Sequence, residues 1–119
     1  MKDLSLVLLT PFGKVFEGEA KAIYVPSING PLGILREHTP LIAELAPKGV
    51  LKVETSEKNL YFALFHGAVE VMPDRVIILS EEALIAFDEE EAIALSKKER
   101  KTVSFLDPKQ ELGEKVIKS

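Results

Sequence analysis

The side chains best suited to metal or acid–base chemistry in this 119-residue chain are two histidines, His38 and His66. Their spacing matches no metal-ligand motif, because zinc and related sites need several ligands at characteristic intervals. His38 stands in a turn among polar neighbours, and His66 ends an expected strand before Gly67, which is typical of ordinary surface histidines. The chain has no cysteine, which excludes disulfides and thiolate chemistry and fits a reducing, cytosolic compartment.

The acidic residues and the glycine-containing stretch indicate no catalytic site either. Glu81-Glu82 and residues 89–91 are typical of a solvated surface and of a helix N-terminus, not of a paired acid and base in a pocket. Residues 30–33 cannot cradle a phosphate, because Pro31 removes one of the backbone N–H donors that such a loop needs. We therefore expect no catalytic residue and no metal ligand, and a metal-dependent β-fold enzyme is the least favoured hypothesis.

Composition narrows the possible partners. Apolar residues make up 46% of the chain and charged residues 29%, which indicates one globular domain with an appendage. The net charge is -4 with both signs interspersed, so no basic stripe predicts a nucleic-acid partner. No segment approaches the ~20 apolar residues that cross a bilayer, so we expect no direct membrane insertion.

The N-terminal two thirds of the chain has the pattern of a β domain. Runs of alternating or wholly apolar residues, separated by turn residues, predict many short strands and therefore a β-sandwich or flattened barrel. Residues 60–65 are apolar on both faces and predict a central strand. The expected strands cover residues 4–10, 15–20, 22–25, 50–55, 60–65, 68–72 and 75–79.

The pattern changes after Ser80, and the C-terminal part predicts helices. In residues 88–101 acids lead and bases trail, which suits the helix dipole, and Asp88 with Glu91 can form a capping box. Asp107-Pro108 is a second helix start, so we expect a short helical hairpin after the sandwich. The first helix is poorly amphipathic and is expected to be held loosely. The predicted domains are residues 1–84, the β-sandwich, and residues 85–119, the helical part.

Residues 25–44 form an expected long connection with an unusual apolar content. Connections that face only water are normally polar, so an ordered apolar one either fills its own core or meets a partner. We expect Leu32, Ile34 and Leu41 to fill the core, and the exposed residues of this connection to contact a partner.

Four segments in order resemble the epsilon subunit of F-type ATP synthase. Residues 10–20 are similar to the family's opening hairpin, residues 67–71 to its Gly-x-x-Glu-Val strand, and residues 75–79 to its last strand. The most specific match is residues 30–41, which fit the family signature Gly-x-Leu-Gly-Ile-Leu-x-x-His-x-Pro-Leu.

This resemblance implies a non-catalytic subunit of the central rotor stalk, peripheral on the cytoplasmic face of the plasma membrane. Its implied partners are the gamma subunit and the c-subunit ring, with transient contact to the alpha/beta catalytic head. It would couple ring rotation to ATP synthesis, and its C-terminal helices can restrain ATP hydrolysis. The alternative from a different class is a small β-sandwich binding module for a soluble ligand.

The resemblance assigns the contacts with gamma and the c ring to the apolar connection. The chain departs from the family at Pro31, where an acid is usual, and at Arg36-Glu37, where Pro-Gly is frequent. The ring contact must then use other groups. The expected partner-binding residues are Ile28, Asn29, Pro31, Arg36, Glu37, His38 and Pro40.

Some bacterial members of the family bind ATP through an Ile/Leu-Asp-x-x-Arg-Ala motif on the first C-terminal helix. Glu82, Asp88 and Ala92 match the residues used in those members. Glu91 stands where the arginine would be, which reverses the charge that a phosphate needs. We therefore expect weak ATP binding or none, and no other cofactor.

Overall fold

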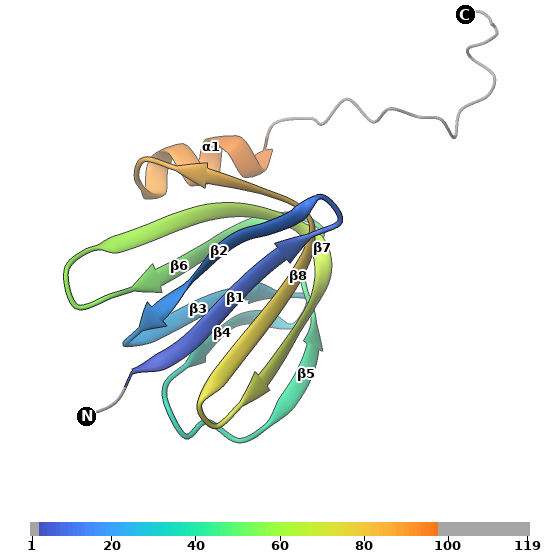
Figure 1. Ribbon diagram of the computed structural model, residues 1–119. Coiled ribbons are helices and arrows are strands. Elements are labelled where there is room, and N and C mark those ends of the chain that lie inside the picture. Colours follow the sequence, from blue (N-terminus) through green and yellow to red (C-terminus); the bar gives the residue numbers. More distant parts are fainter. Residues whose placement is uncertain (1–2, 98–119) are drawn as a thin grey trace, which may run out of the picture.

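The computed structural model describes residues 3–97, which fold into eight strands followed by one helix (Figure 1). The expected second helix and residues 98–101 of the first lie outside the described residues. The elements in order are β1 (Leu4–Thr10), β2 (Gly13–Ala20), β3 (Ala22–Ser27), β4 (Gly30–Ile34), β5 (Leu41–Glu44), β6 (Gly49–Glu54), β7 (Asn59–Met72), β8 (Arg75–Ala86) and α1 (Glu89–Lys97).

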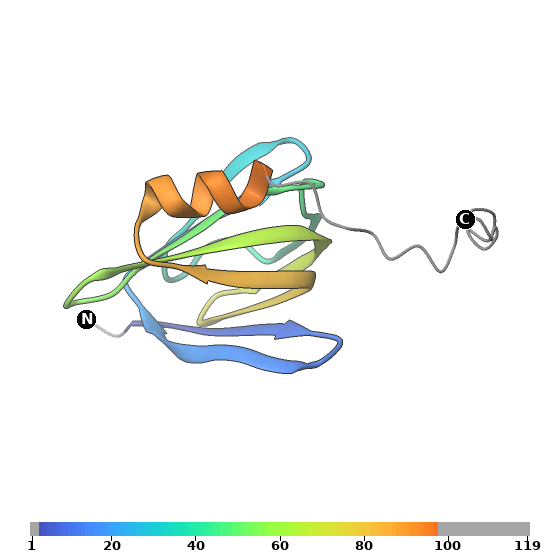
Figure 2. The ribbon, with the colours of Figure 1, turned by 90° about the horizontal axis from the view of Figure 1, so that it is seen from above.

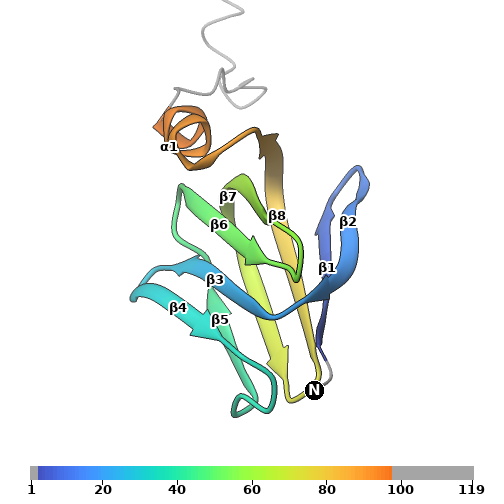
Figure 3. The same ribbon diagram turned by 90° about the vertical axis from the view of Figure 1, so that its left-hand side faces the viewer.

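The strands form a β-sandwich wrapped toward a barrel, as the sequence predicted. Along the sheet the order is β2-β1-β8-β7-β6-β3-β4, and β5 pairs with β7. All pairings are antiparallel except β1 with β8. An isolated bridge joins Ser27, at the end of β3, to Leu45, the residue that follows β5. Viewed from the side, β1 and β2 lie on one side of β8, β4 and β6 lie on the other, and β3 crosses from the end of β2 toward β4 (Figure 3).

The long hairpin of β7 and β8 contributes to both layers of the sandwich. The side of the hairpin that faces the core changes midway along its length. Phe62 and Leu64 point into the core before the change, and Val69 and Val71 do so after it. A strict period of two cannot bring both pairs to one side, so the hairpin must bend between them. We call residues 59–65 and 82–86 the upper half of the hairpin, and residues 67–72 and 75–80 the lower half.

Gly67 and Ser80 make this bend. Gly67 has φ +131°, and a Cβ there would collide with the carbonyl oxygen of Leu79, so only glycine fits. The Ser80 hydroxyl, buried in the bend, accepts a hydrogen bond from the Phe65 amide at 3.1 Å and donates to the Glu82 carbonyl at 2.7 Å. The side chain thus satisfies backbone groups at the point where the ladder is interrupted.

Two strands were not predicted from the sequence. Residues 25–44 were expected to be a long connection, but β4 and β5 lie within them. The reason is a period of two that turn residues had masked: Ile34 is fully buried, and Leu32 and Leu41 pack against the core. The expectation that these three side chains fill the core is confirmed. β8 also continues to Ala86, beyond the expected end at Leu79.

Helix α1 lies on the upper half of the hairpin and on β6 (Figure 2). The Asp88 half of the predicted capping box is present, because the Asp88 carboxylate accepts from the Glu91 amide at 2.9 Å. The Glu91 carboxylate accepts from the Phe87 amide, one residue before the amide that a capping box uses. The contact of α1 with the sheet is made by small residues, since Ala92 and Ser96 are its buried side chains. The position of α1 explains why β7 is apolar on both faces.

Candidate partner-binding site

The described residues contain no arrangement suited to metal chemistry. No group of three or more His, Cys, Asp or Glu side chains gathers within residues 3–97. His66 is exposed at the bend, and the Nδ1 atom of His38 lies 2.7 Å from the Thr39 carbonyl oxygen. Among the described residues, no helix has both the length and the apolar content to span a bilayer.

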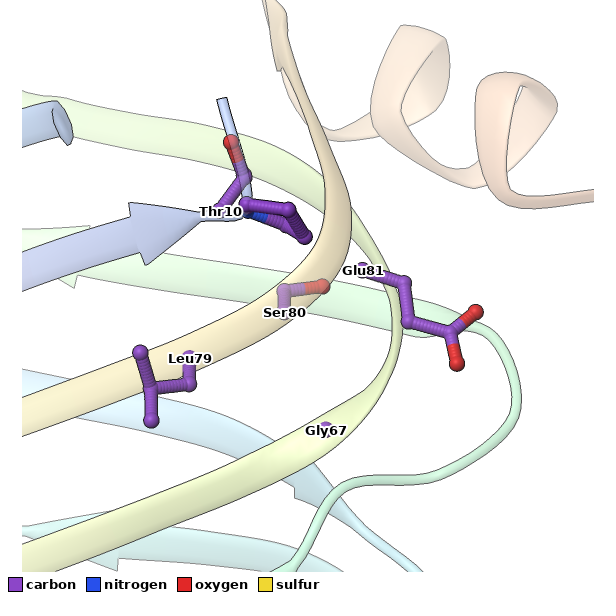
Figure 4. A pocket seen from close by; sticks show the side chains of 6 residues that line it. Thr10, Gly67, Leu79, Ser80 and Glu81 are labelled. Carbon is purple, nitrogen blue, oxygen red and sulfur yellow. The ribbon is translucent and has the colours of Figure 1, made fainter. Parts of the chain in front are cut away.

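A shallow pocket lies at the bend of the hairpin (Figure 4). It is lined by Thr10, Pro11, Gly67, Leu79, Ser80 and Glu81. The Ser80 hydroxyl already bonds to backbone groups, so it is not free to act as a nucleophile. The pocket therefore offers mainly apolar contact, and Leu79 connects it with a larger apolar surface.

That larger surface is the outer face of the sheet formed by β5, the lower half of the hairpin and β1. The strand registers place Ile42, Glu70, Ile77 and Val7 in one row across these strands. Glu44, at the end of β5, begins the next row, which continues through Ala68, Leu79 and Leu9. We call it the apolar face, and it consists of Val7, Leu9, Ile42, Ala68, Met72, Ile77 and Leu79.

The apolar face is accessible in the described part of the chain. Ile42 is 75% exposed and Leu79 51% exposed, while the other members are partly exposed. None of the elements in residues 3–97 covers it, because α1 lies on the upper half of the hairpin. A contiguous apolar patch of this kind is characteristic of a protein–protein interface.

The apolar face carries one carboxylate near its centre, that of Glu70. The registers place Glu70 between Ile42 and Ile77, so apolar side chains flank it on both neighbouring strands. Within the described residues no cation lies within 4 Å of this carboxylate. Arg75 is a diagonal neighbour on β8, but its guanidinium contacts the Met72 sulfur at 3.7 Å.

The partner-binding residues predicted from the sequence fall into two separate groups. Ile28, Asn29 and Pro31 lie at the tip of the β3–β4 hairpin, where the Asn29 amide donates to the Ser27 hydroxyl at 3.2 Å. Ile28, Asn29 and Pro31 are exposed. We call them the hairpin tip, and β4 separates them from the second group by roughly 16 Å of strand.

The second group, Arg36, Glu37, His38 and Pro40, lies in the loop before β5. The Arg36 guanidinium donates to the Asp3 carbonyl at 3.1 Å, so it is tied to the N-terminal segment. Glu37 has φ +69°, and its amide donates to the Pro73 carbonyl at 2.6 Å, which ties the loop to the β7–β8 turn. Because Pro40 directly precedes β5, this loop borders the apolar face.

Sequence reasoning did not single out the apolar face itself. A usable signal was present in residues 4–10 and 75–79, which are apolar at nearly every position. One side of each strand fills the core, with Leu6 and Ile78 fully buried. The apolar residues on the other side then require a covering element or a partner.

The side chains that match the family's nucleotide motif do not form one accessible group that could contact a nucleotide. Ala92 is fully buried between α1 and the sheet, and Asp88 is engaged in capping the helix. Glu82 lies on β8 opposite Phe65. Glu91 is held at the N-terminus of α1 by the Phe87 amide, so a carboxylate occupies the place of a phosphate-binding cation.

A different polar row lies on β3, β6 and β7, away from the apolar face. Lys52 stands between Tyr24 and Tyr61 in the register, with its ammonium 5.5 Å from the centre of the Tyr24 ring. Its hydrogen bond to Glu54 raises the pKa of Lys52 above the usual value. These contacts fix Lys52 within its own sheet.

Similarity to known proteins extends over most of the chain. Residues 3–86 match the family model of the ATP synthase delta/epsilon chain β-sandwich domain. The ATP synthase epsilon chain of Halalkalibacterium halodurans is 40% identical over 111 residues, covering 93% of this chain and 83% of that protein. The ATP synthase epsilon chain of Bordetella avium is 41% identical over 102 residues, covering 84% of this chain and 71% of that protein.

Two solved assemblies contain chains with a similar fold. One is the mitochondrial ATP synthase of Euglena gracilis, with a TM-score of 0.67 and 24% identity over 80% of this chain and 61% of the matched chain. The other is the central stalk and c ring of the Tetrahymena thermophila mitochondrial ATP synthase, with a TM-score of 0.61 and 18% identity over 86% of this chain and 78% of the matched chain. At these identities the likeness concerns the fold.

Proposed function

The chain belongs to the ATP synthase delta/epsilon chain family, and on this premise we propose that it is the epsilon-type subunit in the central stalk of a bacterial ATP synthase. In this role it carries no catalytic residue and couples rotation of the c ring to ATP synthesis in the catalytic head. The match to bacterial epsilon chains over most of their length supports this proposal. The alternative, a binding module for a soluble ligand, has no support among these relatives.

The gamma subunit docks on the apolar face in this proposal. The observation that carries it is an apolar sheet surface that no element of residues 3–97 covers, with Ile42 and Leu79 exposed. Leaving such a surface in water is unfavourable, and covering it with a partner gains about 25 cal/mol per Å² of apolar area. The loop of Arg36 to Pro40 borders this surface and contributes polar contacts at its rim.

The hairpin tip is proposed to contact the c ring. It projects at the far end of β4 from the loop that borders the apolar face, so one domain can meet two partners at once. Ile28 supplies an exposed apolar side chain there, and Asn29 supplies an amide for the polar loops of the ring. The protein would then lie peripherally on the cytoplasmic side of the membrane.

Co-expression with the gamma subunit tests the proposal. A stable one-to-one complex that survives size-exclusion chromatography is the expected result. Failure of the full chain to form a complex with gamma of the same organism would contradict the proposed function. Isothermal calorimetry with ATP is the complementary test, and because Glu91 replaces the motif's arginine, we expect no micromolar affinity for ATP.

A further inference from the structure

Glu70 is the feature of the apolar face that its apolar character does not explain. Resting on the proposed docking of gamma on this face, we propose that a guanidinium or ammonium group of that partner pairs with the Glu70 carboxylate. The ion pair fixes the position at which the partner lies on the sheet. Glu70 is thus a specificity-determining residue within the interface.

The geometry places Glu70 well inside the apolar face and not at its rim. Ile42 and Ile77 are its direct cross-strand neighbours, with side chains about 4.5–5.5 Å apart at Cβ in such pairs. Ala68 and Met72 are the next residues on the same side of β7. A partner that covers these four apolar side chains must also cover the carboxylate.

Covering the carboxylate has a strong electrostatic consequence. An ionised carboxylate removed from water without a partner is strongly destabilised, so the docked protein must supply a compensating charge. No cation of the described residues lies within 4 Å of Glu70. Glu44 lies diagonally across at the end of β5, so it stands at the rim of the apolar face and away from the carboxylate's direct apolar neighbours. The charge of Glu70 itself therefore favours a cation over a neutral donor.

The same geometry lets the ion pair fix the lateral position of the partner on the sheet. Neighbouring strands are ~4.8 Å apart, so a shift of the partner by one strand would place its cation against Ile42 or Ile77. An ion facing an apolar side chain in a dry interface is unfavourable. Apolar contacts alone tolerate such a shift far better, because they are not directional.

Arg75 is the internal competitor for this role. It occupies the diagonal position on β8, where side chains can still reach one another. In the structure its guanidinium contacts Met72 instead. Arg75→Ala therefore separates an internal ion pair from one that the partner supplies.

The test measures the affinity of the full chain for the gamma subunit by calorimetry, with thermal unfolding of each variant as the folding control. Glu70→Gln keeps the size of the side chain and removes its charge, and we expect about a 30-fold loss of affinity or more. Glu70→Lys should weaken binding further, since the new lysine would face the partner's cation and repel it. Glu44→Gln is the matched control and should change affinity by less than about threefold, as expected for a rim charge.

The outcomes separate the two levels of the proposal. Absence of binding by the wild-type chain would overturn the proposed function. Unchanged affinity of Ile42→Asp would overturn docking on the apolar face. If Ile42→Asp weakens binding while Glu70→Gln matches Glu44→Gln, the ion pair alone is refuted. An equal loss of affinity for Arg75→Ala and Glu70→Gln would also refute the ion pair with the partner, because the cation that compensates Glu70 would then be Arg75 of the same chain.

Discussion

The two halves of the β7–β8 hairpin differ in how their outer apolar side chains are covered. Both halves carry apolar side chains on the side that faces away from the core. In the upper half, Ala63 and Phe65 are buried, and α1 lies over this side. In the lower half, Ile77 and Leu79 remain accessible. Within residues 3–97, α1 covers the outer side of the upper half and no element covers that of the lower half, which is why we propose docking at the lower half.

The contact made by α1 also differs in chemistry from the apolar face. It rests on Ala92 and Ser96, small residues that let the helix lie close to the sheet. The apolar face instead presents the larger side chains of Ile42, Ile77 and Leu79. Small side chains bury little area each, so helix docking should be weak and size-sensitive, whereas the apolar face can support a stable complex.

The largest effect should follow from removing the bend that creates both halves. Gly67→Ala places a Cβ against the Leu79 carbonyl, in a backbone conformation that side chains rarely adopt, and should destabilise the protein by more than about 3 kcal/mol. Urea denaturation measures this. Gly13→Ala is the matched control, because Gly13 has a similar φ of +128° with open space around it. Equal losses for the two variants would show that the collision at the bend does not matter.

An intermediate effect should follow from enlarging a small side chain at the contact between α1 and the sheet. Ala92→Leu adds volume where the helix meets the sheet and should destabilise helix docking by about 1–3 kcal/mol. Hydrogen exchange of the α1 amides should accelerate, while the core strands stay protected. Ala94→Leu is the control on the exposed side of the same helix. Slower exchange of the α1 amides in Ala92→Leu than in Ala94→Leu would contradict a close contact between Ala92 and the sheet.

The smallest effect should follow from removing the side chain that closes the N-terminus of α1. Glu91→Ala loses the acceptor of the Phe87 amide and should weaken the helix by about 0.5–1 kcal/mol. Glu90→Ala changes an exposed acid in the same turn and serves as the control. Amide exchange at the N-terminus of α1 distinguishes them. If the two variants exchange alike, the capping contact contributes nothing.

Much of the fold could be predicted from the sequence, because periodicity and turn residues are local signals. The strand β1 and the Asp88 cap of α1 were predicted at the residues where they occur. The strands β4 and β5 were missed because they are short, and Pro31 and Gly33 within β4 are turn-forming residues. The bend at Gly67 was missed because the need for glycine there comes from the close approach of the Leu79 carbonyl, a contact that periodicity does not contain.

The candidate site was predicted in part, and for a related reason. The sequence directed attention to residues 28–40, which supply the hairpin tip and the loop beside the apolar face. The face itself is assembled from β1, β5, β7 and β8 by strand register, so its residues are far apart in the chain. No local pattern can reveal which apolar side chains remain uncovered once the helix has taken its place.

One pair of substitutions tests the central claim directly. Leu79 is 51% exposed on the apolar face and Ile93 is 39% exposed on α1, so replacing either with aspartate should leave the core intact. Calorimetric titration with the gamma subunit compares them. The account predicts a loss of about 100-fold or more for Leu79→Asp and an unchanged affinity for Ile93→Asp. Unchanged binding by Leu79→Asp together with a loss for Ile93→Asp would contradict the account and assign the docking site to the helix.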